Sequence, residues 1–287
     1  MKKKKLSYWL FLAPVLIAFL LVVVVPLIIG IYLSFTDWNG ISSTINFTGV
    51  ENYINAFKNE GFRNSFWFTT KFTIVSVIVL NVMGFGLALL VTQKLKTSNA
   101  LRTIFFMPNL IGGLILGFIW QFVFQEVFAG VGKVIGSKGL MGWLSTEKTG
   151  FWGLVILMSW QMAGYLMIIY ISGIQNISTD VLEASKIDGA SSWQRLKYII
   201  LPLVRPAMTI SVFLTLSNSF KLYDQNLSLT AGGPGNSTEM IAMNILKTGQ
   251  QFNKMGEAQA KALILLVVVG LISLVQVYFS KRGEVEA

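Results

Sequence analysis

The stretch Asp180–Pro206 reads DVLEASKIDGASSWQRLKYIILPLVRP. It is the longest polar interval that we expect to lie in the cytoplasm. Asp180, followed three residues later by Glu183, predicts a helix that begins with an N-cap and a capping-box acid. Gly189 can adopt the positive φ that ends such a helix. The apolar face of this helix consists of Val181, Leu182, Ala184 and Ile187.

A second helix is predicted directly after the first. Ser191 with Gln194 three residues later repeats the capping signal, and this helix should continue until Pro202 interrupts it. A short amphipathic helix, a glycine turn and a second helix that leads back into an apolar span form a surface on which a partner protein can dock. The arrangement is typical of a docking site and not of a catalytic site.

The composition indicates a membrane protein. The chain has 287 residues, of which 54% are apolar and 13% charged, with a net charge of +10. The basic residues concentrate at the ends of apolar spans, which indicates positive-inside topology and no nucleic-acid surface. The sequence has no cysteine and no histidine, so disulfides, thiol chemistry and the commonest general base and metal ligand are excluded. We therefore expect neither a catalytic site nor a metal site.

Uncharged intervals predict an all-α polytopic membrane protein that forms one domain over residues 1–287. The apolar run after Lys2–Lys5 is too long for the core of a signal peptide, so the first helix should be retained, with kinks at Pro14 and Pro26. A short helix from Glu51 to Phe57 should lie along the outer membrane surface. The six predicted spans are 8–35, 70–93, 103–124, 151–173, 203–223 and 262–280.

The distribution of cations orients these spans. The predicted cytoplasmic segments hold 13 of the 23 Lys and Arg residues, whereas the longer outer loops hold 8. This bias predicts that both termini lie in the cytoplasm. It also places the loop of residues 180–206 in the cytoplasm.

Two features allow alternative interpretations. Gly113 and Gly117 lie four residues apart and permit close helix approach, either to a partner chain or within this chain. The fifth span is short, because only the residues between Arg205 and Lys221 are uncharged. Lys221 should therefore either pair with Asp224 at the outer interface or face a water-filled cavity.

Aromatic and amide side chains within the spans are candidates for a solute path, because a sugar needs both. They either contact solute or form hydrogen bonds that hold the helices together. For Asn81, Asn109 and Gln121 the second interpretation is favoured. The candidates for the solute path are Trp160, Gln161, Tyr165, Thr215, Asn218, Ser219, Lys221 and Tyr223.

The loop resembles the EAA loop of bacterial ABC importer permeases in four fragments, Glu183-Ala184-Ser185, Asp188-Gly189-Ala190, Ile200-Leu201-Pro202 and Pro206. Three further fragments resemble the six-helix permeases for oligosaccharides in the same order, namely Phe47–Tyr53, Arg102–Pro108 and Thr230–Glu239. The resemblance covers nearly the whole chain. Ser185 departs from the pattern, since the family usually has a second Ala there.

The resemblance implies that the first helix of the loop sits in a groove of an ATP-binding subunit. Glu183 would pair with a basic residue of that subunit, and Gly189 would set the turn. The alternative is that Glu183 only caps its own helix and Gly189 only ends it. The coupling residues implied by the resemblance are Val181, Leu182, Glu183, Ala184, Asp188, Gly189, Ala190, Leu201 and Pro202.

The implied function is that of a permease subunit in the bacterial inner membrane, within an ATP-driven, binding-protein-dependent importer of an oligosaccharide. Its partners would be a second permease, two ATP-binding subunits and an extracytoplasmic solute-binding protein. Gly132-Lys133 lacks the flanking residues of a Walker A motif, so ATP and Mg would bind to the partner ATPase and this chain would bind no cofactor.

Other functions remain possible from the residues. The same machine could import a glycerol-phosphate-like or another small solute. A proton-coupled transporter or channel would need carboxylates within the spans, but every Asp and Glu lies in a loop, a tail or at a span end. A membrane enzyme would need a nucleophile and a base in the membrane, and the sequence has no His or Cys to supply them.

Overall fold

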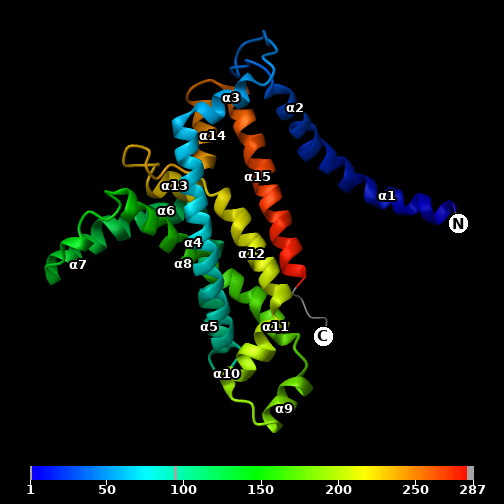
Figure 1. Ribbon diagram of the computed structural model, residues 1–287, viewed down its shortest axis with the longest axis vertical. Coiled ribbons are helices and arrows are strands. Elements are labelled where there is room, and N and C mark those ends of the chain that lie inside the picture. The colour runs from blue at the N-terminus through cyan, green and yellow to red at the C-terminus, as the bar shows by residue number, and fades with distance from the viewer. Residues whose placement is uncertain (1, 94–95, 283–287) are drawn as a thin grey trace. The chain divides into compact units, whose positions relative to one another are not determined.

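The structure, a computed structural model, describes residues 2–93 and 96–282 and is all-helical apart from one isolated bridge between Thr36 and Phe47 (Figure 1). The chain divides into two compact units. The first unit consists of Met1–Phe62 and Ile245–Val267, and the second consists of Arg63–Asn244 and Val268–Ala287. Within the described residues, five helices are long and apolar enough to cross a membrane, or six if one bent pair counts as a span.

The first unit begins with an apolar helical run made of α1 (Lys2–Phe19), a π-helical turn (Leu20–Val24) and α2 (Val25–Leu33). Pro14 lies inside α1 without interrupting it. The π-helical turn directly precedes Pro26, because a proline removes one backbone donor and its ring crowds the carbonyl four residues earlier. Only the second of the two prolines therefore coincides with a change in helix type.

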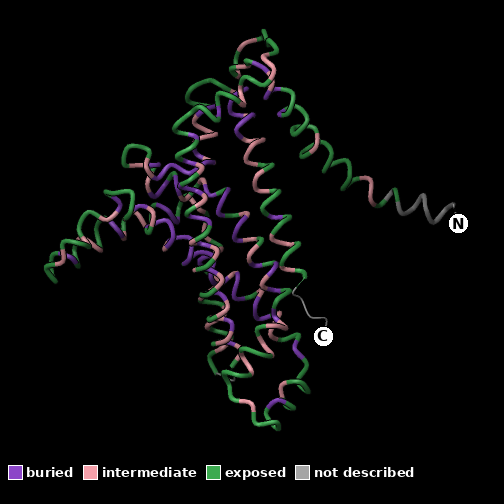
Figure 2. Tube along the Cα trace, viewed as in Figure 1, coloured by how far each residue is buried: buried purple, intermediate pink, exposed green. Residues whose placement is uncertain are grey.

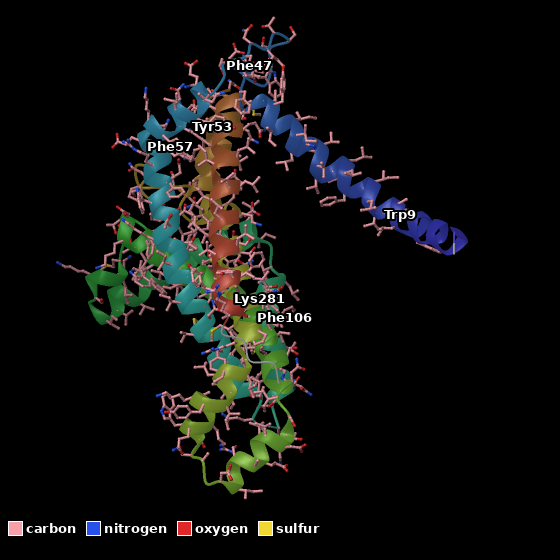
Figure 3. All side chains as sticks on the ribbon, turned by 45° about the vertical axis from the view of Figure 1, so that its right-hand side comes forward. Trp9, Phe47, Tyr53, Phe57, Phe106 and Lys281 are labelled. Carbon is pink, nitrogen blue, oxygen red and sulfur yellow. The ribbon has the colours of Figure 1, made fainter. Side chains whose placement is uncertain are left out.

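The segment of the first unit that follows α2 is held by side chain to backbone hydrogen bonds. The Asn52 side chain donates to the carbonyls of Ser34 and Thr36 at 2.9 and 2.8 Å. The predicted short helix exists as α3 (Glu51–Lys58) and carries Tyr53 and Phe57 (Figure 3). The centre of the Tyr53 ring lies 5.4 Å from that of Phe35. Two hydrogen bonds from Asn46 hold the pKa of Asp37 below its ordinary value.

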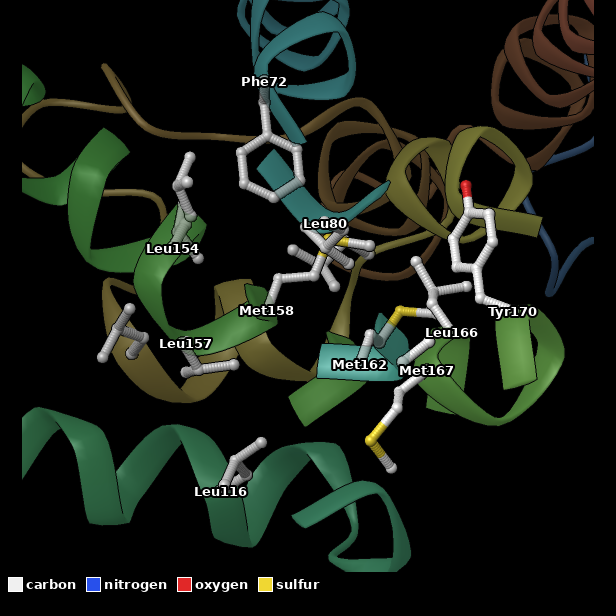
Figure 4. Packing of buried hydrophobic residues seen from close by; sticks show 14 of the residues in the cluster. Phe72, Leu80, Leu116, Leu154, Leu157, Met158, Met162, Leu166, Met167 and Tyr170 are labelled. Carbon is white, nitrogen blue, oxygen red and sulfur yellow. The ribbon is translucent and has the colours of Figure 1, made fainter. Parts of the chain in front are cut away.

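The second unit is built around one helix, α8, which is buried over most of its length (Figure 2). Its Leu, Met and Tyr side chains form the core with Phe72, Leu80 and Leu116 from neighbouring helices (Figure 4). The outward faces of the surrounding helices stay apolar and exposed, as expected for surfaces that face lipid. The helices, some shared with the first unit, are α4 (Glu60–Val91), α5 (Ser98–Phe106), α6 (Gly113–Phe122), α7 (Phe128–Ile135), α8 (Glu147–Gln175), α9 (Thr179–Ile187), α10 (Ser192–Arg195), α11 (Leu201–Leu203), α12 (Arg205–Phe220), α13 (Asp224–Leu229), α14 (Ile241–Gln250) and α15 (Met255–Lys281).

The third predicted span, 103–124, is broken in the structure. A 3₁₀ turn at Met107–Leu110 contains Pro108 and ends α5, and the extended residues Ile111 and Gly112 follow before α6 begins. The candidate span here is Gly113–Ile135, which continues into a region predicted to be an outer loop. Pro108 explains the interruption, since it cannot donate the hydrogen bond that a continuous α-helix needs.

The two glycines of α6 serve packing within the chain. A Cβ at Gly117 would lie 1.8 Å from Oγ of Ser228, and a Cβ at Gly113 would lie 2.9 Å from Cβ of Asp224. Both contacts come from α13, which therefore approaches α6 more closely than any larger residue would permit. Of the two interpretations of this pair, the structure supports packing within the chain.

Amides inside the second unit join its helices, as predicted for Asn81 and Gln121. The hydroxyl of Tyr170 donates to Oδ1 of Asn81 at 2.7 Å, which links α8 to α4. Nε2 of Gln121 donates to the carbonyl of Leu229 at 3.3 Å, which links α6 to α13. A polar group that is buried in an apolar bundle needs such a partner.

Candidate functional site

The loop of residues 180–206 begins with α9, whose N-cap is Ser178 and not Asp180. The side chain of Ser178 accepts the backbone N–H of Asp180 at 3.3 Å, so the prediction of Asp180 as N-cap was wrong. Asp180 lies in the first turn, where its negative charge interacts favourably with the positive end of the helix dipole. Gly189 has a φ of +77°, as predicted, and the N–H of Ala190 closes the end of α9 on the carbonyl of Ser185 at 3.0 Å.

The second helix of the loop has the predicted capping box. The N–H of Gln194 donates to Oγ of Ser191 at 3.3 Å, and the N–H of Ser191 donates to Oε1 of Gln194 at 2.7 Å. The helix does not stop at Pro202. It passes through a π-helical turn at Leu196–Ile200 and continues to Leu203, and there the direction changes by 67° into α12.

The predicted coupling residues divide between the inside and the outside of the second unit. Leu182 packs against the core of the unit, and this contact fixes α9 on the bundle. Val181 remains 44% exposed and Ile187 87% exposed. Glu183 is exposed and makes no hydrogen bond or ion pair with the residues that the structure describes. The other exposed or half-buried residues of the predicted set are Ala184, Asp188, Gly189, Ala190, Leu201 and Pro202.

A polar cavity of about 360 Å³ lies in the second unit, between the break that precedes α6, the middle of α8, and the break between α12 and α13. Its lining combines amides, a phenol and a cation with three apolar side chains. The lining residues are Asn109, Gln161, Met162, Tyr165, Leu214, Asn218, Lys221, Leu222 and Gln225. We call this site the polar cavity.

Two hydrogen bonds order one wall of the polar cavity. Nε2 of Gln161 donates to the carbonyl of Ile111 at 3.1 Å, in the extended segment between α5 and α6. Nε2 of Gln225 donates to Oε1 of Gln161 at 2.8 Å. The amide of Gln161 is therefore held by both interrupted spans, because it donates to one and accepts from the other.

Lys221 lines the polar cavity and does not pair with Asp224 in the described part of the chain. The lining contains no carboxylate to neutralise this cation. Lys221 lies at the C-terminal end of α12, where the helix dipole favours a positive charge. The structure therefore supports the cavity-facing alternative for this residue.

The other predicted path residues lie elsewhere. Trp160 lines a second cavity of about 470 Å³, which is lined mainly by apolar side chains. Thr215 is fully buried and donates to the carbonyl of Ser211 at 2.8 Å, and Ser219 is also fully buried. Tyr223 is not among the residues that line the polar cavity.

Two polar residues of the lining, Asn109 and Gln225, were not predicted. Asn109 was interpreted as a helix-joining amide, and Gln225 was not singled out. Both follow an interruption in a span, Asn109 after Pro108 and Gln225 after the break at Lys221. Interrupted helices that line a cavity are typical of solute sites in transporters, so polar residues beside a proline or a short span were the available signal.

The described residues, 2–93 and 96–282, contain no group of three or more His, Cys, Asp or Glu side chains that could hold a metal ion. An all-helical membrane bundle with interrupted spans around a polar cavity and a loop shaped for docking defines a membrane transport protein.

The chain belongs to the family of binding-protein-dependent transport system inner membrane components, whose family model matches residues 81–284. It is a multi-pass inner membrane protein and a permease subunit, and it is not itself an enzyme. Two relatives align over nearly their full length. The probable starch degradation products transport system permease protein AmyD of Thermoanaerobacterium thermosulfurigenes is 53% identical, with 99% of this chain and 97% of the relative covered. The multiple sugar-binding transport system permease protein MsmF of Streptococcus mutans is 31% identical, with 96% of each chain covered.

A solved structure has the same fold. It is the crystal structure of a bacterial ABC transporter involved in the import of the acidic polysaccharide alginate. Its matching chain is 22% identical, with a TM-score of 0.84 over 98% of this chain and 96% of that chain. The similarity confirms the predicted all-α permease fold.

Proposed function

We propose that this chain is the permease subunit of an ATP-driven importer of oligosaccharides, and that the polar cavity is its part of the solute path. The observation that carries this proposal is the lining of the cavity, where amide, phenol and ammonium groups converge beside the middle of α8. Sugar hydroxyls both donate and accept hydrogen bonds, so such a lining suits them. The names of both relatives point to sugar transport.

The proposed cargo is a starch-derived oligosaccharide, because the relative with 53% identity is named for starch degradation products. A second candidate is a small solute that carries a phosphate. Lys221 favours this candidate, since it is a cation in a lining without a carboxylate. The two candidates differ in charge, so competition between them separates the two proposals.

Energy is proposed to enter through α9, with both termini and the loop in the cytoplasm. Val181, Glu183 and Ile187 are exposed and, since Leu182 fixes α9 on the bundle, movement of this helix would reach the spans. The proposed assembly contains a second permease, two ATP-binding subunits and an extracytoplasmic solute-binding protein. ATP and Mg would bind only to the ATP-binding subunits.

Uptake of radiolabelled maltooligosaccharide into proteoliposomes tests the cavity. Asn218→Leu and Tyr165→Phe are expected to reduce uptake by the assembled transporter about tenfold or more, because each change leaves a sugar hydroxyl without a partner at a cost of about 1–3 kcal/mol. Met83→Leu in the apolar cavity is the matched control and should retain uptake. Unchanged uptake by both cavity variants would overturn the proposal. Stronger competition by glycerol phosphate than by the unlabelled sugar would support the second candidate.

A further inference from the structure

The segment Ser192–Leu203 leaves the fifth span at an angle of 67° to α12 (Figure 1). α12 has 16 residues and is about 24 Å long, which is shorter than a hydrocarbon core of about 30 Å. The segment therefore turns away from the direction of α12 at the end of a span that is shorter than the hydrocarbon core.

One face of this segment packs against the protein and the opposite face does not. Ile200 and Leu203 contact the core of the second unit. Trp193, Lys197 and Leu201 follow one another at intervals of four residues and form an exposed row. The exposed side chains are large, since Trp193 is 69% exposed.

The exposed face combines aromatic rings with positive charge. Tyr198 lies beside the row and is 66% exposed, and Nζ of Lys197 lies 5.1 Å from the centre of its ring. Trp and Tyr are the side chains that concentrate at membrane interfaces, because one end is apolar and the other polar. The face thus resembles that of a helix that lies on a membrane.

The surrounding sequence carries cations without acids. Arg195 and Lys197 lie within the segment and Arg205 follows it, whereas no Asp or Glu occurs between Asp188 and Asp224. Anionic headgroups in the cytoplasmic leaflet attract such a cluster. A docked protein surface would instead favour a mixture of both charges, as α9 has with Asp180, Glu183 and Lys186.

We propose that Ser192–Leu203 is an interfacial helix that binds anionic phospholipid headgroups in the cytoplasmic leaflet. Trp193 and Tyr198 insert at the headgroup level, while Arg195 and Lys197 contact lipid phosphates. The inference rests on the proposed cytoplasmic orientation of the loop. It concerns a surface separate from the exposed residues of α9 and from the polar cavity, so it is independent of the cargo, and it assigns Leu201 to lipid and not to coupling.

Spin-label accessibility in the reconstituted transporter, measured without and with its ATP-binding subunits, tests this surface. The native chain has no cysteine, so Tyr198→Cys provides a single labelling site. In vesicles of phosphatidylcholine with phosphatidylglycerol, the label should collide more often with oxygen, which concentrates in lipid, than with a water-soluble nickel chelate. Vesicles of phosphatidylcholine alone lack anionic headgroups. In them, the ratio of labels immersed in lipid to labels exposed to water should fall about fivefold for each cation that contacts an anionic headgroup in the mixed vesicles.

Reference and charge variants complete the test. Val82→Cys on α4, which is 67% exposed, reports the hydrocarbon, and Ile187→Cys on α9 reports water when the ATP-binding subunits are absent. Arg195→Gln with Lys197→Gln should abolish the difference between the two lipid compositions. A label at position 198 that is freely accessible to the chelate in both vesicles would overturn the proposal. So would a label that becomes inaccessible to both reagents only when the ATP-binding subunits are added, because the face would then be a protein interface. Neither result would affect the uptake test of the polar cavity.

Discussion

Replacing Gly164 by Ala is expected to lower the free energy of unfolding of the second unit by about 3 kcal/mol, at the upper end of the usual range for overpacking. A Cβ at this position would lie 1.8 Å from the carbonyl oxygen of Phe105 and 2.3 Å from its carbonyl carbon. Both atoms belong to backbone, so no side-chain rotation can relieve the contact. α5 would have to move away from α8, whose core side chains hold the unit together.

Unfolding in increasing fractions of sodium dodecyl sulfate, followed by circular dichroism, measures this effect. The matched control is Gly86→Ala on α4, where a new Cβ would meet no atom within 4 Å. That change should be neutral or stabilising by up to about 1 kcal/mol, because alanine is the better helix former. If Gly164→Ala unfolds at the same detergent fraction as the native chain, the close approach of α5 to α8 is wrong.

Glu183→Lys is expected to abolish the coupling of this chain to its ATP-binding partner while leaving the fold intact. Glu183 is exposed and has no partner among residues 2–93 and 96–282, so its removal costs the chain itself little. A reversed charge facing a basic residue of the partner would cost about 2–5 kcal/mol, or a loss of about thirtyfold or more in productive association. Sugar-stimulated ATP hydrolysis by the reconstituted complex measures the loss.

The charge-matched control for this experiment is Glu147→Lys at the start of α8, outside the loop of residues 180–206. It should alter stimulation less than twofold, since it only exchanges an exposed charge near a helix N-terminus, which is worth about 0.3–1 kcal/mol. Gly189→Asp should behave like Glu183→Lys, because Asp strains the backbone at a φ of +77° and redirects the end of α9. Native stimulation in both loop variants would show that α9 is only a structural helix.

Local features of the loop could be predicted from the sequence because they depend on neighbours in the chain. The capping box of Ser191 and Gln194 and the positive φ of Gly189 involve contacts within a few residues. The N-cap of α9 was mistaken by two residues, because Ser178 and Asp180 are both good N-caps and the residue types alone do not distinguish them. Long apolar helices occur where charge and hydropathy agree in the sequence, as in α8 and α15.

The interruptions that create the polar cavity could not be predicted in this way. The break after α12 brings α13 onto Gly113 and Gly117, and these residues are far from α13 in the sequence. The positions of Asn109 and Gln225 in the lining follow from those breaks. An amide has the same appearance in a sequence whether it joins two helices or lines a cavity, so the place of Asn109 in the lining could not be predicted.

The most direct test of the account is the reactivity of a thiol in the polar cavity. Because the chain has no cysteine, Asn218→Cys introduces one reactive site, and Met83→Cys in the apolar cavity serves as the reference. We predict that a membrane-impermeant maleimide modifies position 218 in the ATP-free complex, and that oligosaccharide delivered by the binding protein slows this modification but not that of position 83. Modification of position 218 at the same rate with and without oligosaccharide, in the presence and absence of ATP, would contradict the assignment of the polar cavity to the solute path.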